Sequence, residues 1–241
     1  MLATTRHGSV SLLELQRPER RNALDLAQCR ALAEAAQTEV AAGARVLVIT
    51  GQGTSFCSGA DLTGVYGTEF LDALYGMLHG LTRLPVPVIA AVNGPAIGAG
   101  TQLALACDLR VADESARFAV PTARNGMAVD AWTMRALAHV AGGGLARRLM
   151  LAAETVDRDE ALRAGLADRA GDLDAALAWA QEIATLAPLT LAHNKLVLNR
   201  LVDTAQDAEI DASFAACWAS DDVREAATAR TERRTPVFTG R

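Results

Sequence analysis

Two short runs of β-branched and other apolar residues, each followed by a loop of small residues, constrain this chain more than any other feature. The runs lie at 45–50 and 88–92, and the loops that follow them lie at 51–59 and 93–100. Short apolar runs bounded by turn residues are typical of strands buried on both faces of a sheet. A loop of Gly, Ala and Ser after such a strand brings bare backbone to the edge of the sheet. The pattern predicts an α/β protein.

Strands and helices alternate through the first half of the chain. Further strands are predicted at 10–15, 109–112 and 116–120, and helices at 24–42, 69–81 and 101–106. Asp25 is placed to cap the first helix. Such alternation predicts an α/β fold with buried strands.

The second half changes character. From about residue 132 it consists almost entirely of helix-forming residues with breaks at Gly and Pro, and successive helices are predicted at 173–186 and 189–201. These helices are interpreted either as a cap on the domain or as an oligomerisation arm, and the sequence does not separate the two.

Composition excludes several classes of protein. The 241 residues are 51% hydrophobic and 21% charged, as in ordinary globular proteins and unlike disordered chains. A net charge of -5 gives no basic excess for a nucleic-acid partner. The four cysteines and four histidines are scattered, so neither a disulfide framework nor a metal site is expected. We expect no signal peptide, no membrane insertion and a cytoplasmic protein.

Motifs for nucleotide binding and serine hydrolysis are missing or incomplete. The loop after the run at 45–50 has Gly51 and Gly53, but Phe56 stands where the dinucleotide fingerprint needs its third glycine. Neither a phosphate-binding P-loop nor a nucleophile elbow occurs. The two small-residue loops therefore carry the functional prediction.

These loops could form an oxyanion hole. The second loop leads into a helix N-terminus, where unpaired N–H groups favour negative charge. Two N–H donors that converge on one carbonyl oxygen stabilise the charge that develops there. The alternative is that each loop is simply a tight turn.

Four motifs together resemble the crotonase (enoyl-CoA hydratase/isomerase) superfamily. They are residues 16–24 (QRPERRNAL), 56–62 (FCSGADL), 91–100 with Cys107-Asp108, and 233–238. They occur in the family's order and spacing over nearly the whole chain. The resemblance implies a spiral of repeated ββα units with a helical C-terminal trimerisation region. We expect a spiral core at 1–185, an oligomerisation region at 186–241, and a homotrimer or a hexamer.

The resemblance also implies a thioester of coenzyme A as substrate or ligand, with no other cofactor and no metal. The thioester oxygen would lie between the N–H groups of Ala60 and Ala99. Thr63 stands where many members carry a phosphate-binding lysine. The remaining residues that the resemblance assigns to coenzyme A are Glu19, Arg20, Arg21, Ala23, Ser58, Ala60, Asp61, Leu62 and Arg233. Ordinary surface charge is the alternative for the arginines.

The sequence departs from a hydratase where the chemistry is done. In the family, two catalytic carboxylates activate one water molecule and deliver its proton. The matching positions here are Gln102 and Thr122. Neither side chain can act as a carboxylate base, so efficient hydratase activity is not expected. The pattern is most similar to a short actinobacterial subgroup without either glutamate. That likeness implies binding of fatty acyl-CoA in lipid metabolism.

Asp130 is the one carboxylate that could compensate. Some isomerases and dehalogenases of the superfamily place a working aspartate there, and Asp130 could instead cap the helix that follows it. Two alternatives to simple acyl-CoA binding therefore stay open: an isomerase with Asp130 as acid/base, and a weak hydratase. The acyl pocket could be lined by Tyr66, Phe70, Leu74 and Trp132, with core packing as the other interpretation.

Overall fold

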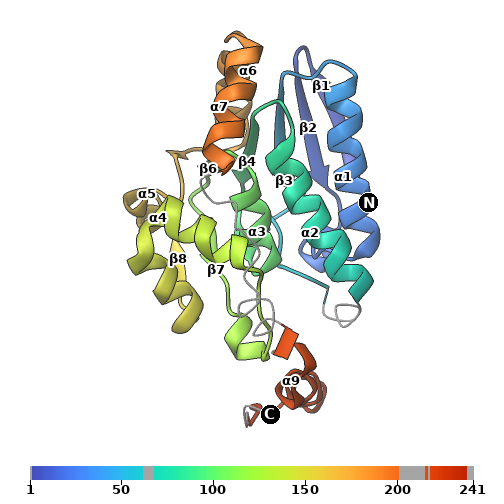
Figure 1. The fold of residues 1–241 in the computed structure, drawn as a ribbon, viewed down its shortest axis with the longest axis vertical. Helices are drawn as coiled ribbons and strands as arrows, with labels where there is room; N and C mark the ends of the chain where they lie inside the picture. The colour runs from blue at the N-terminus through green and yellow to red at the C-terminus, as the bar shows by residue number, and fades with distance from the viewer. Residues whose placement is uncertain (1, 62–67, 201–214, 217, 238–241) are drawn as a thin grey trace.

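The computed structural model describes residues 2–61, 68–200, 215–216 and 218–237. Two sheets carry the chain through its first 170 residues, and helices cover them (Figure 1). The strands are β1 (Leu2–His7), β2 (Val10–Leu15), β3 (Val46–Gly51), β4 (Val88–Val92), β5 (Pro95–Ile97), β6 (Leu109–Ala112), β7 (Arg117–Ala119), β8 (Thr155–Asp157) and β9 (Arg169–Ala170). The helices are α1 (Leu26–Ala41), α2 (Thr68–Arg83), α3 (Ala99–Ala106), α4 (Ala131–Leu151), α5 (Arg158–Ala164), α6 (Leu173–Ala184), α7 (Pro188–Arg200) and α9 (Asp221–Glu232), with short 3₁₀ turns η1 (Pro18–Arg20) and η2 (Thr122–Asn125).

The larger sheet has the order β1-β2-β3-β4-β6-β9. Only β1 runs antiparallel to its neighbour, and the other neighbouring strands are parallel. The smaller sheet has the order β5-β7-β8. Because β4 belongs to the larger sheet and β5 to the smaller, the loop between them turns the chain from one sheet to the other.

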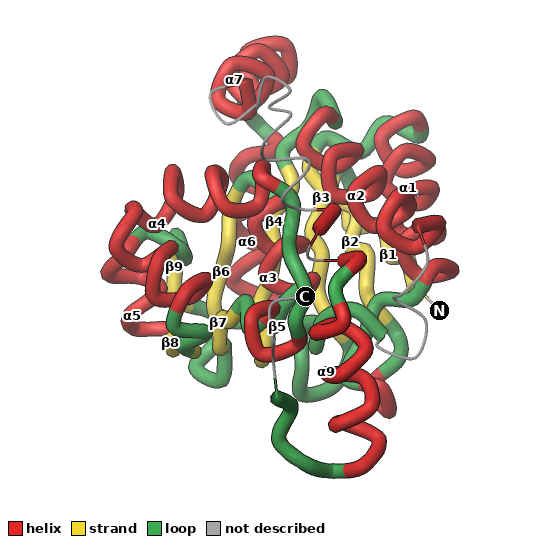
Figure 2. The backbone as a smooth tube through the Cα atoms, turned by 60° about the horizontal axis from the view of Figure 1, so that its bottom comes forward, coloured by secondary structure: helices red, strands yellow, loops and turns green. Residues whose placement is uncertain are grey.

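Alternate residues of the central strands face two separate apolar clusters. Leu47 and Ile49 of β3 pack into the cluster that α1, α2 and α3 share, whereas Val46 and Val48 pack against α6. Figure 2 shows α1 and α2 together on one side of the strands. Burial on both faces is why these strands appear in the sequence as continuous apolar runs.

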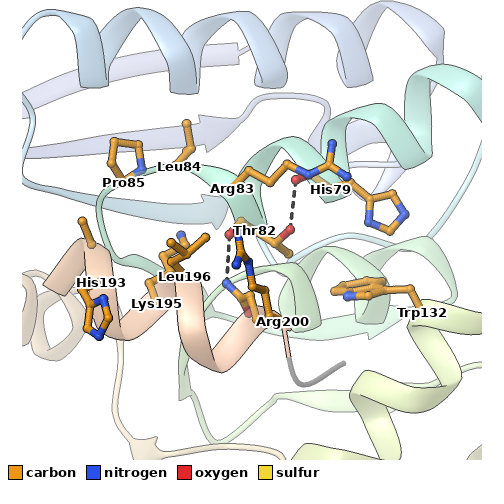
Figure 3. Close-up of a pocket in the computed structure, with 12 residues that line it drawn as sticks. His79, Thr82, Arg83, Leu84, Pro85, Trp132, His193, Lys195, Leu196 and Arg200 are labelled. Carbon is orange, nitrogen blue, oxygen red and sulfur yellow. Dashed lines mark hydrogen bonds between the residues drawn. The ribbon is translucent and has the colours of Figure 1, made fainter. Parts of the chain in front are cut away.

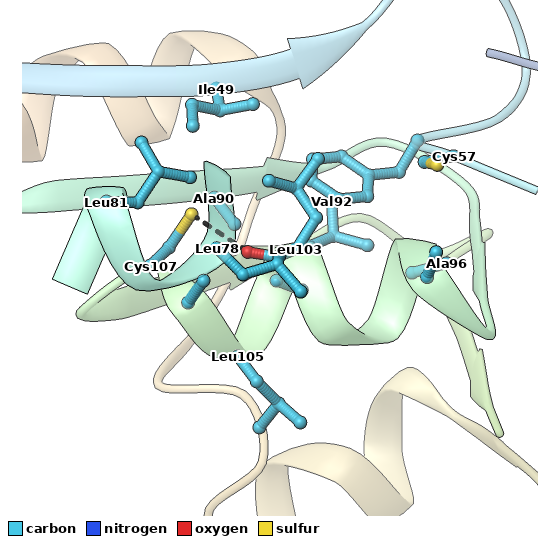
Figure 4. Packing of buried hydrophobic residues seen from close by; sticks show 14 of the residues in the cluster. Ile49, Cys57, Leu78, Leu81, Ala90, Val92, Ala96, Leu103, Leu105 and Cys107 are labelled. Carbon is cyan, nitrogen blue, oxygen red and sulfur yellow. Dashed lines mark hydrogen bonds between the residues drawn. The ribbon is translucent and has the colours of Figure 1, made fainter. Parts of the chain in front are cut away.

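The apolar helix α3 lies inside the larger cluster. All eight of its residues are buried, and Leu103 packs among residues of β3, β4 and α2 (Figure 4). Its composition of Ala, Gly, Leu, Thr and Gln is consistent with burial on every side. Packing on every side therefore fixes the position of α3 and of the N–H groups in its first turn.

Most of the predicted elements are confirmed, with two kinds of correction. The first strand, β1, was not predicted, because its residues LATTRH alternate poorly and lie at an edge of the sheet. The second half is not all helix: it supplies β8 to the smaller sheet and β9 to the larger one. Strands of two or three residues give too short a pattern to detect.

Contacts made by α7 and α9 hold the C-terminal helices to the rest of the chain. Lys195 of α7 is buried and forms an ion pair with Asp108 at 2.7 Å, and it also donates to the carbonyls of Leu81 and Val86. The start of α9 packs against Gly126, where a Cβ atom would lie 2.9 Å from the Asp222 carbonyl. The expected domain boundary at 185/186 falls between α6 and α7 and stays a prediction.

No helix in the described part of the chain is both long and apolar enough to cross a membrane.

Candidate functional site

The two small-residue loops lie side by side. The Cys57 N–H donates to the Pro95 carbonyl at 3.1 Å, and the Ile97 N–H donates to the Cys57 carbonyl at 2.9 Å. A Cβ atom at Gly100 would lie 2.0 Å from that same Cys57 carbonyl oxygen, and one at Gly59 would lie 2.8 Å from the Ile97 carbonyl oxygen. Glycine is therefore required at both positions for the loops to approach this closely.

This approach brings Ala60 and Ala99 to one place. A Cβ atom at Gly59, the residue before Ala60, would lie 3.7 Å from the Ala99 nitrogen. Ala99 is the first residue of α3, so its N–H has no partner within the helix. Within the described residues, neither the Ala60 nor the Ala99 N–H has a hydrogen-bond acceptor. Two unpaired donors lie on adjacent loops beside a cavity.

The segment at 20–24 pairs with the first of these loops. The Ser58 N–H donates to the Arg21 carbonyl at 2.9 Å, and the Ser58 hydroxyl donates to the Arg20 carbonyl at 3.2 Å. The Leu24 N–H donates to the Gly59 carbonyl, and the Asp61 N–H donates back to the Leu24 carbonyl at 2.7 Å. The structure thus brings together the predicted residues Arg20, Arg21, Ala23, Ser58, Ala60 and Asp61.

Two residues that the sequence analysis missed hold this segment in place. Asn22 is fully buried with a φ of 56°, and its amide donates to the carbonyls of Gln52 and Ser55. Arg17 forms ion pairs with Asp25 at 2.7 Å and with Asp61 at 3.2 Å. The Asp61 side chain therefore serves structure. Both Arg17 and Asn22 lie inside the motif at 16–24, which was the available signal.

A cavity of about 100 Å³ opens beside the two alanines. Gln102 of α3 and Thr122 of η2, the two positions that the resemblance assigns to the family's glutamates, both line it. The predicted pocket residues Phe70 and Leu74 line it too, and Tyr66 lies outside the described residues. No Asp or Glu is among the described residues that line this cavity.

Gln102 and Asp130 are linked through Thr133. The Gln102 amide nitrogen donates to the Thr133 hydroxyl at 2.8 Å, and that hydroxyl donates to Asp130 Oδ1. Asp130 also accepts from the Thr133 N–H at 3.0 Å, so it caps α4, as one of the two sequence interpretations predicted. Asp130 itself is not among the described lining residues of the cavity.

Tyr75 and His79, one turn apart on α2, complete this polar cluster, and the sequence analysis missed both. The Asp130 N–H donates to the Tyr75 hydroxyl at 3.2 Å, and His79 Nε2 lies 3.2 Å from Asp130 Oδ2. Burial, and then the nearby Asp130 charge, raise the pKa of the Tyr75 hydroxyl well above its usual range, so this phenol stays protonated. No spacing in the sequence indicates contacts between α2 and α4.

Four other predicted residues do not line this first cavity or lie outside the described residues. Leu62 lies outside the described residues. Glu19 is exposed on η1, and Arg233 is exposed at the end of α9. No contact in the described chain joins Arg233 to Arg20 or Arg21. Trp132 lines a second cavity instead of this one. No group of metal-binding side chains occurs among the residues that the structure describes.

Comparison with known proteins now decides the family. The sequence profile of the enoyl-CoA hydratase/isomerase family matches residues 5–241. The chain belongs to the enoyl-CoA hydratase/isomerase family. It is 45% identical over 243 residues to "Probable enoyl-CoA hydratase echA6" of Mycobacterium tuberculosis, with both chains covered completely. It is 35% identical to "2,3-dehydroadipyl-CoA hydratase" of Escherichia coli, covering 100% of this chain and 99% of that one.

Solved structures of the family share the fold. An enoyl-CoA hydratase/isomerase from Pseudoalteromonas atlantica is 30% identical, with a TM-score of 0.86 over 99% of each chain. Methylmalonyl-CoA decarboxylase in complex with 2S-carboxypropyl CoA has a TM-score of 0.91 at 22% identity, over 100% of this chain and 98% of that one. The predicted crotonase fold class is confirmed.

Proposed function

We propose that this family member binds fatty acyl thioesters of coenzyme A through the N–H groups of Ala60 and Ala99 and lacks efficient hydratase activity. One observation carries the proposal: two unpaired N–H donors lie beside a cavity with no carboxylate among its described lining residues. The donors can polarise a thioester carbonyl. Hydration also needs a group that removes a proton from water, and neither the Gln102 amide nor the Thr122 hydroxyl does so unaided.

The contacts to coenzyme A are part of the same proposal. The paired backbone at 20–24 and 58–61 places Arg20 and Arg21 next to the cavity's Ser58, which supports nucleotide and pantetheine binding along this edge, and Glu19 directly precedes this segment on η1. Leu62 and Arg233 belong to the proposal through the resemblance alone. Guanidinium groups suit phosphate because they donate two parallel hydrogen bonds.

The isomerase alternative stays a prediction. The Asp130 side chain does not line the cavity, and both of its oxygens already have partners. The test is exchange of the acyl α-protons of butyryl-CoA with heavy water, followed by NMR, in the wild type and in Asp130→Asn. Exchange that disappears in Asp130→Asn would establish the alternative, whereas a wild type without exchange supports binding alone.

Assembly as a trimer or hexamer is also proposed. Leu189, Val197 and Leu198 of α7 are 86%, 46% and 59% exposed in the single chain, which favours burial of this helix by another subunit. Sedimentation velocity of the wild type against Leu189→Glu/Leu198→Glu tests this. A monomeric wild type would contradict it.

Calorimetry tests the binding proposal. Titrations with butyryl-CoA, decanoyl-CoA and free coenzyme A separate the acyl contribution from that of the nucleotide. We expect both thioesters to bind more tightly than free coenzyme A, because only they have a thioester carbonyl that can accept from the N–H groups of Ala60 and Ala99. Equal affinities for all three would mean that the N–H pair makes no contact with the thioester.

A further inference from the structure

A second, larger cavity lies outside the site described above. Its volume is about 600 Å³, and it is lined by the end of α2, the turn that follows, Trp132 of α4, and α7 (Figure 3). Cavities of this size can hold a small organic molecule. Tyr75 lines the smaller cavity and His79 the larger one, so the two are separated by one turn of α2.

The charge of its lining is one-sided. Five of the twelve lining residues are basic and none is acidic, in a chain whose net charge is -5. Two of the five already have partners inside the protein: Lys195 forms an ion pair with Asp108 at 2.7 Å, and His79 Nε2 lies 3.2 Å from Asp130 Oδ2. The Lys195 ammonium also donates to two carbonyls and has no donor left.

The other three basic side chains have no such partner among the described residues. Arg83, His193 and Arg200 have no ion-pair or hydrogen-bond partner for their side chains among the described residues. The docking of α7 does not use them, because Lys195 and Asn199 make its hydrogen bonds to α2. Two guanidinium groups that line one cavity favour an anion, and their planar donors match a carboxylate.

Most of the remaining lining is apolar, with Thr82 and Asn199 as its polar members. The buried Trp132 side chain lines the cavity together with Leu84, Pro85 and Leu196. A small inorganic anion would leave this apolar surface in contact with water, whereas an alkyl chain would bury it. The ligand that uses both parts of the lining has an apolar chain and one anionic end.

We infer that this cavity is a binding site for a fatty carboxylate, separate from the thioester site. Arg83 and Arg200 hold the carboxylate, and Trp132, Leu84 and Leu196 contact the chain. The inference does not depend on the proposed thioester function, since no residue is shared by the two cavities.

Calorimetric titration with decanoate, below its critical micelle concentration, tests the inference on the full-length protein. We expect decanoate to bind to the wild type, and about tenfold more weakly to Arg83→Gln and to Arg200→Gln, which is the effect of losing one hydrogen-bonded charge. The control Arg147→Gln removes an exposed arginine that does not line the cavity and should leave the affinity unchanged. Decanol, which keeps the chain without the charge, should bind more weakly than decanoate.

Three results would overturn the inference. Decanoate affinity equal in the wild type, Arg83→Gln and Arg200→Gln would place the ligand elsewhere, the thioester cavity included. Inorganic phosphate that binds as tightly as decanoate would show that the apolar lining is not used. No decanoate binding at all would remove the site. Butyryl-CoA is titrated into the same variants as a separate test of the thioester proposal. Its affinity should not change in Arg83→Gln or Arg200→Gln, because neither arginine lines that cavity.

Discussion

Gln102 and Asp130 are joined through one hydroxyl group: the Gln102 amide nitrogen lies 2.8 Å from Thr133 Oγ1, which in turn donates to Asp130. A carboxylate only accepts hydrogen bonds, so the Thr133 hydroxyl must point its proton at Asp130 and accept from Gln102. The amide nitrogen of Gln102 is therefore turned toward Thr133. The Gln102 amide is therefore held in one orientation, at the position that the family resemblance assigns to a carboxylate.

Thr133→Val tests this link. Valine keeps the shape of threonine but removes the hydroxyl. The buried Gln102 amide then loses this acceptor, and Asp130 loses this donor. We expect the free energy of unfolding to fall by about 1–3 kcal/mol in urea denaturation. Thr133→Ser should recover most of the loss. Thr38→Val, at an exposed position of α1, should change stability by no more than about 0.5 kcal/mol.

Gly100→Ala tests the close approach of the two loops. The added Cβ would lie 2.0 Å from the Cys57 carbonyl oxygen, so the backbone must move. We expect a loss of about 3 kcal/mol in stability and a loss of butyryl-CoA binding. Gly80→Ala on α2 is the matched control, because nothing lies within 4 Å of its Cβ. That control should be neutral or more stable by up to about 1 kcal/mol.

Gln102→Glu with Thr122→Glu tests the interpretation of the missing carboxylates. Both positions line the cavity, so two carboxylates there can share one water. We expect hydration of crotonyl-CoA to rise about a hundredfold or more over the wild-type rate, as positioned acid–base groups typically provide. The single variants should gain little. A double variant that is folded by circular dichroism, binds crotonyl-CoA and remains inert would contradict the assignment of these positions.

Buried thiols predict a loss of stability in alkali. Burial raises the pKa of Cys29, Cys57 and Cys107 to about 12, whereas an unfolded thiol ionises near 9.0. Below pH 9 the thiols are neutral in both states and their stabilising contribution is complete. Between pH 9 and 12 only the unfolded chain releases these protons, which lowers the free energy of unfolding by up to about 1.4 kcal/mol per pH unit for each thiol.

Urea unfolding at pH 8 and pH 10.5 measures this effect. Cys107→Ala removes one of the three thiols and should reduce the difference between the two pH values by about a third of the part that the thiols contribute. A difference as large in Cys107→Ala as in the wild type would show that other groups cause it.

Most of the strands and helices could be predicted from the sequence. The contacts between elements that are distant in the sequence could not. The strands at 46–51 and 88–92 are readable because burial on both faces leaves an uninterrupted apolar run. The small-residue loops are readable because their glycines stand where backbone meets backbone. His79 and Tyr75 were missed because they meet Asp130 only after α2 packs beside α4.

The edges were harder to predict than the centre. β1 has four exposed residues out of six, so it lacks the apolar pattern of the inner strands. Trp218 lines the cavity beside Ala60 and Ala99 from a segment far along the chain, where its indole donates to the Ala128 carbonyl at 3.2 Å. Only the folded chain brings that tryptophan to Gln102 and Thr122.

The most direct test of the central claim is a paired measurement on one preparation of the wild-type protein. Calorimetry would give the affinity for crotonyl-CoA, and absorbance of the same ligand would follow its hydration at a saturating concentration. The account predicts tight binding with a hydration rate near that of the buffer alone. Rapid hydration would contradict it, because water would then be activated without a carboxylate at Gln102 or Thr122.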